Sequence, residues 1–84
     1  MFELLLNKYN ISFNEVFEIR EIKTNRMIGK YYFIKDDKDV FTLCRKRLQP
    51  DKGISKVSSL TTGNILLGLM KNKITIIKTN DIIK

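Results

Sequence analysis

The sequence has no histidine and a single cysteine, Cys44, and these two shortages exclude most catalytic and metal-binding chemistry. Without histidine the chain has no Ser–His or Cys–His nucleophile pair, no histidine general base and none of the common zinc sites. One cysteine also leaves no partner for a disulfide within the chain. We therefore expect a protein that is not an enzyme and that uses no cofactor and no metal.

Long apolar runs are missing as well. Stretches such as Leu4–Leu6 and Ile65–Leu67 are three residues long, and Glu3, Asn7 and Lys8 interrupt the apolar N-terminal segment. This pattern predicts neither a signal peptide nor a membrane span. A reducing cytoplasm is the expected location for such a chain with one unpaired cysteine.

Carboxylates are few compared with cationic side chains. The chain has nine Asp and Glu against sixteen Lys and Arg, a net charge of +7. Residues 26–56 hold nine cations and four anions, residues 71–84 hold four cations and one anion, and residues 57–70 hold no charge. An uneven positive charge favours a polyanion or an acidic protein surface as partner, and also serves simply to keep a small domain soluble.

The 84 residues are enough for one domain, residues 1–84, with one compact core. Apolar spacing of i, i+3, i+4 and i+7 predicts a helix over 2–9, and alternation predicts a strand from 13. A high density of aromatic and β-branched residues predicts a second strand over 27–35, and a third follows over 40–44. Thr61 or Thr62 is the expected start of a second helix, which ends at Lys71-Asn72 before a strand over 73–78. Gly29 is expected to mark a bulge. The prediction is an α+β fold, a small antiparallel sheet with two short helices in the order α-β-β-β-α-β, with an SH3-like barrel as the alternative.

Candidate binding residues come from the long irregular segment 45–59. The segment carries five cations that are able to contact phosphates: Arg45, Lys46, Arg47, Lys52 and Lys56. A charged loop is as often merely solvated. Tyr32 is a further candidate, as a ring on which a nucleic-acid base stacks. Alternation puts Tyr31 and Phe33 on the other face of their strand, so at least one of these two sets belongs to the core.

Two other features have simpler interpretations. An EF-hand loop starting at Asp36 would need glycine at its sixth position and glutamate at its twelfth, where this chain has Phe41 and Arg47. The aspartates at 36, 37 and 39 therefore indicate a turn. Cys44 is followed by cationic side chains that lower a thiol pKa, but its place in an apolar strand favours packing.

Two blocks of sequence show a resemblance to a known group of proteins. Residues 11–19 (ISFNEVFEI) and 60–78 (LTTGNILLGLMKNKITIIK) resemble blocks of short uncharacterised phage and prophage accessory proteins of low-GC Gram-positive bacteria. The resemblance implies a mobile-element origin, the cytoplasm of an infected or lysogenic bacterial host, and stoichiometric binding to a host or defence-system protein or nucleoprotein. It implies no catalytic residue.

Together these observations predict a small non-enzymatic binding protein of inhibitor type. The alternative is a basic nucleic-acid-binding accessory protein that contacts the phosphate backbone. The positive charge counts against an inhibitor that mimics DNA, because such a mimic needs negative charge.

Overall fold

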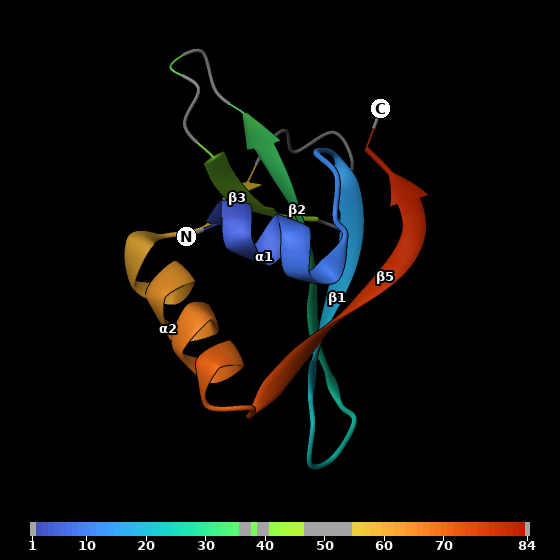
Figure 1. Ribbon diagram of the computed structural model, residues 1–84, viewed down its shortest axis with the longest axis vertical. Coiled ribbons are helices and arrows are strands. Elements are labelled where there is room, and N and C mark those ends of the chain that lie inside the picture. The colour runs from blue at the N-terminus through green and yellow to red at the C-terminus, as the bar shows by residue number, and fades with distance from the viewer. Residues whose placement is uncertain (1, 36–37, 39–40, 47–54, 84) are drawn as a thin grey trace.

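A computed structural model shows a five-stranded antiparallel sheet with two helices and describes residues 2–35, 38, 41–46 and 55–83 (Figure 1). The elements in chain order are α1 (Phe2–Tyr9), β1 (Glu15–Glu21), β2 (Met27–Lys35), β3 (Phe41–Arg45), β4 (Ser55–Lys56), α2 (Ser59–Met70) and β5 (Ile74–Ile82). The predicted α+β class and element order are confirmed, and the two-residue β4 is an addition within the segment that was expected to be irregular.

The sheet has the strand order β4-β3-β2-β1-β5. Strands β1, β2 and β3 form the expected meander, and β5 returns to lie antiparallel beside β1. Within the described residues the edge strands β4 and β5 pair only with β3 and β1. Among the described residues the sheet is therefore open at these two edges, and the closure expected of the alternative SH3-like barrel is not seen there.

The main core lies between the sheet and both helices. It contains Phe17, Phe33 and Tyr31, with the ring centroid of Phe17 5.4 Å from that of Phe33 and 6.4 Å from that of Tyr31. Leu69 of α2 belongs to the same cluster, and α1 packs Leu6 against it. Both helices thus cover one face of the sheet.

The opposite face holds a smaller cluster of Val16, Tyr32 and Cys44, one from each strand of the meander. Ile83, just after β5, packs against this cluster, and its N–H donates to the carbonyl of Asn14 at 2.7 Å. Strand β5 is strongly curved (Figure 1); its Ile76 belongs to the main core, and Ile83 just beyond it packs against the second cluster.

Asparagine and glycine shape the turns. Every non-glycine residue with a left-handed backbone among the described residues is an asparagine: Asn10, Asn14, Asn25, Asn72 and Asn80. Asparagine tolerates this conformation better than other side chains. The pairing of β1 with β2 shifts register opposite Gly29, which confirms the predicted bulge, and the ring of Tyr31 covers that glycine.

None of the described helices has the length and apolar character needed to cross a bilayer.

Candidate functional site

Helix α2 is uncharged and only lightly buried. Its N-terminus is capped by Ser58, whose Oγ accepts a hydrogen bond from the N–H of Thr61 at 3.2 Å, so the helix begins earlier than the Thr61 or Thr62 cap predicted. Leu69 is its one buried residue. Leu60 is 77% exposed and Met70 is 72% exposed. A helix that is apolar on most sides is normally buried, so this outer surface is unusual for a folded monomer.

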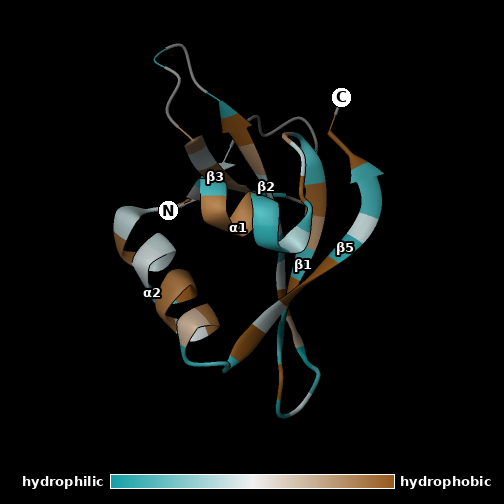
Figure 2. Ribbon diagram, in the orientation of Figure 1, coloured by the Kyte–Doolittle hydropathy of each residue, from teal (hydrophilic) through white to brown (hydrophobic). Residues whose placement is uncertain are grey.

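An apolar groove separates α1 from the C-terminal half of α2. Its volume is about 120 Å³, and it is lined by Leu4, Leu5, Lys8, Tyr9, Leu66, Leu69 and Met70. Figure 2 shows apolar residues on both helices. We call this feature the α1–α2 groove. Leu4 and Met70 on its rim are each 72% exposed, and among the described residues no carboxylate lines it.

The groove ends where α2 ends, in a rigid C-terminal turn. The N–H of Lys73 donates to the carbonyl of Gly68 at 2.9 Å, and the N–H of Asn72 donates to that of Leu69 at 3.2 Å. Together with the left-handed backbone of Asn72, these bonds form a Schellman motif. The predicted helix end at Lys71-Asn72 is confirmed, and both flanking lysines sit on a fixed turn.

A basic depression follows directly. It measures about 530 Å³ and is lined by Glu21, Ile22, Lys23, Lys71, Asn72, Lys73 and Ile74. The N–H of Ile22 donates to the carbonyl of Lys73 at 3.0 Å, which ties the β1–β2 turn to the end of α2. We call this feature the lysine depression. It brings together cations from two turns that are about fifty residues apart in sequence.

Most of the described ion pairs lie on strands of the sheet and on the β1–β2 turn. These pairs are Arg20–Glu18 at 2.7 Å, Lys78–Glu15 at 3.1 Å, Arg26–Glu21 at 3.8 Å and Lys46–Asp81 at 3.9 Å. No described carboxylate forms an ion pair with Lys23, Lys71 or Lys73. Positive charge is therefore left uncompensated at the lysine depression.

The cations predicted to bind phosphate do not form one patch. Strand register places Lys56 opposite Cys44 and Arg45 opposite Tyr31, so these two cations lie on different faces of the sheet. Lys46 is half-buried and paired with Asp81. The remaining two predicted residues, Arg47 and Lys52, lie outside the described residues.

Tyr32 does not have the exposure that base stacking needs, which corrects its place among the binding residues. It is 5% exposed and packs with Val16 and Cys44. Burial, followed by the neighbouring Cys44, raises the pKa of the Tyr32 hydroxyl. The ring is part of the second core cluster, the role that strand alternation left open to it.

Cys44 is fully buried, in agreement with the packing interpretation. Burial raises the pKa of its thiol, and the charge of Lys56 opposes this only in part. The predicted aspartate turn at 36, 37 and 39 lies outside the described residues. In the part of the chain that is described, no three carboxylate or thiol groups lie close enough to hold a metal ion.

Sequence reasoning placed the apolar face of the second helix at Ile65, Leu66, Leu69 and Met70. Of these only Leu69 is buried, and Met70 is exposed. The signal for the groove was the absence of charge over residues 57–70, which marks a helix with no charged face. Comparisons of the chain with protein-family models, curated proteins and solved structures found no match.

Proposed function

We propose that this is a small non-enzymatic binding protein that docks its α1–α2 groove onto another protein and acts stoichiometrically. The observation that carries the proposal is the outer surface of α2, an uncharged helix with one buried residue. Folding has left Leu60, Leu67 and Met70 of this helix exposed, whereas Ile65 packs against the core. The phage-type resemblance makes a host or defence-system protein the proposed partner, in the cytoplasm of the bacterial host.

The exposed residues on the groove rim set the scale of the contact. Burial of a leucine or methionine side chain contributes about 1.5–3 kcal/mol. Leu4 and Met70 together offer about 3–6 kcal/mol, so other contacts of the partner must offset the rest of the cost of association. A small molecule is a poorer fit, because the groove of about 120 Å³ is well below the roughly 300–1,000 Å³ of small-molecule sites.

Site-directed photocrosslinking tests the proposal. A photoreactive residue at position 70 lies on the groove rim, whereas one at Ile82, which is 67% exposed on β5, provides a matched apolar control. In lysate of a low-GC Gram-positive host, the photoreactive residue at position 70 should give one discrete adduct that contains one copy of this protein and one copy of the partner protein. Nuclease treatment should leave this adduct unchanged. Leu4→Glu, which changes the other exposed residue of the groove rim, should reduce the yield of this adduct.

Equal labelling at positions 70 and 82, or no adduct at position 70, would contradict docking through the groove. Thermal melts of each variant establish that it is folded. Turnover of any substrate by the purified protein, lost on one side-chain replacement, would contradict the non-enzymatic assignment.

The second candidate function is nucleic-acid binding through phosphate contacts. It is favoured by Arg45 and Lys56, which are exposed and make no ion pair with a described carboxylate. The burial of Tyr32 removes the stacking contribution and leaves a purely electrostatic contact. Affinity for random oligonucleotides should then fall steeply with salt, and undetectable binding at low salt would eliminate this candidate.

A further inference from the structure

We propose that the segment docking in the α1–α2 groove is an acidic amphipathic helix, whose apolar anchors enter the groove and whose carboxylates contact the lysine depression. This inference rests on the proposed docking function and specifies the chemistry of the partner. It follows from the continuity of the two features, from their charge and from the shape of the groove.

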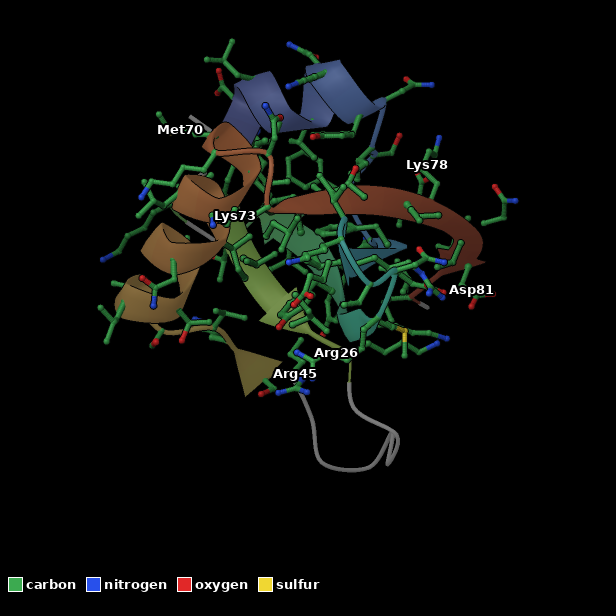
Figure 3. The ribbon with its side chains drawn as sticks, turned by 90° about the horizontal axis from the view of Figure 1, so that it is seen from below. Arg26, Arg45, Met70, Lys73, Lys78 and Asp81 are labelled. Atoms are coloured by element: carbon green, nitrogen blue, oxygen red, sulfur yellow. The ribbon has the colours of Figure 1, made fainter. Side chains whose placement is uncertain are left out.

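The groove and the depression are consecutive parts of one surface. Met70 lines the groove, and the next residue, Lys71, lines the depression. Figure 3 places Met70 and Lys73 on the same side of the molecule, away from Lys78 and Asp81. The Schellman turn and the bond from Ile22 to Lys73 hold the two parts together. A partner that fills the groove and continues past the end of α2 meets cations.

The charge of this surface selects the sign of the partner. Lys8 lines the groove, its ammonium 5.5 Å from the ring centroid of Tyr9, and three more lysines line the depression. The one carboxylate that lines the depression, Glu21, accepts from the Thr24 hydroxyl at 3.0 Å and lies 3.8 Å from Arg26. Carboxylates on a partner would therefore meet cations without displacing an existing ion pair.

Shape and charge disfavour three other occupants. A second copy would present the same surface, which carries four lysines and one carboxylate among its lining residues and so offers little negative charge to pair with them. Nucleic acid has no apolar anchors for the groove. A flat lipid surface contacts the outside of one helix, whereas the groove lies between two helices and suits inserted side chains.

Fluorescence anisotropy with designed helical peptides tests the inference. The probe peptide carries leucines at i, i+3, i+4 and i+7, followed by a run of glutamates. One control peptide replaces the glutamates by lysines, and another replaces the leucines by alanines. The acidic leucine peptide should bind at least about tenfold more tightly than either control, and more weakly as salt is raised.

Matched variants locate the contact. Lys71→Glu and Lys73→Glu should each weaken binding of the acidic peptide by about threefold to tenfold, and Met70→Glu should abolish it. Lys78→Glu makes the same charge change at an exposed site on β5, away from Met70 and Lys73 in Figure 3, and should leave binding unchanged. Far-ultraviolet circular dichroism confirms that each variant is folded.

Equal affinity for the acidic and lysine peptides, or no binding of either, would overturn the inference. So would an equal effect of Lys78→Glu and Lys73→Glu on the affinity for the acidic peptide. Self-association that Met70→Glu abolishes would show that a second copy is the occupant, and binding to phosphatidylglycerol vesicles that competes with the acidic peptide would show that it is a lipid surface. The crosslink at position 70 tests whether the groove docks onto a protein at all, and the peptide experiment tests only the chemistry of the docked segment. Failure of the peptide experiment would therefore not contradict the proposed function.

Discussion

The two glycines of α2 provide a sharp test of its environment, because the same substitution should have opposite consequences at them. A methyl group added at Gly63 meets no atom within 4 Å. The same group at Gly68 would lie 3.1 Å from Cγ1 and Cδ1 of Ile74. Each change to alanine removes the same cost of glycine in a helix, so the difference between them reports the packing of α2 on β5.

The magnitude for Gly63→Ala follows from helix propensity alone. Alanine is more favourable than glycine by about 0.8–1 kcal/mol in a helix interior. In a domain of this size a gain of about 1 kcal/mol raises Tm by about 4–8 °C. Gly63→Ala should therefore be stabilising by that amount.

Gly68→Ala should lose this gain. The new methyl group forces the side chain of Ile74 away from the helix, and overpacking of this kind costs about 1–3 kcal/mol. The variant should be neutral or destabilised by up to about 2 kcal/mol. Urea unfolding, with scanning calorimetry as a second measurement, gives both values. Equal stabilisation by the two substitutions would refute the close contact between α2 and β5.

Three further predictions concern the core and the charges. Leu69→Ala should destabilise by about 2–5 kcal/mol in urea unfolding, because Leu69 is the buried side chain of α2. Cys44 should resist iodoacetamide in the native protein at mildly alkaline pH and react in urea, because burial both shields the thiol and raises its pKa; rapid native labelling would contradict this. The Ser12 N–H and, less strongly, Lys78 lower the pKa of Glu15. The ionised Glu15 side chain therefore stabilises the fold above the ordinary pKa of 4.5, and this stabilisation is lost as pH falls through the lowered pKa. Glu15→Gln should make the free energy of unfolding less dependent on pH in that range.

Local sequence patterns predicted most of the elements because the relevant forces act between near neighbours. The aromatic and β-branched residues along 27–35 defined β2 to the residue, and Asn10 and Asn72 indicated where both helices end. The pairing of Ser55 with Arg45 was not predictable, since a two-residue strand has no periodicity. The start of α2 was misplaced because Ser58 competes with two threonines as a cap.

The candidate site was harder to predict than the fold for a related reason. Counting charge along the chain drew attention to residues 45–56, yet register places Arg45 and Lys56 on different faces of the sheet. Lys23 and Lys73 are far apart in sequence and meet only because β5 pairs with β1. A surface formed by such long-range pairing is invisible to a local window.

Few contacts hold α2 in the fold, and this connects its stability with its proposed role. The helix is fixed by a cap at Ser58, by the side chain of Leu69 and by the turn that joins it to Ile74, and these contacts lie at its ends or on its inner side. Its outer leucines contribute little to folding, because their side chains remain largely in water in the folded chain. A small domain can rarely spare apolar side chains from its core. An uncharged outer face that folding does not require is therefore best explained by a partner that covers it.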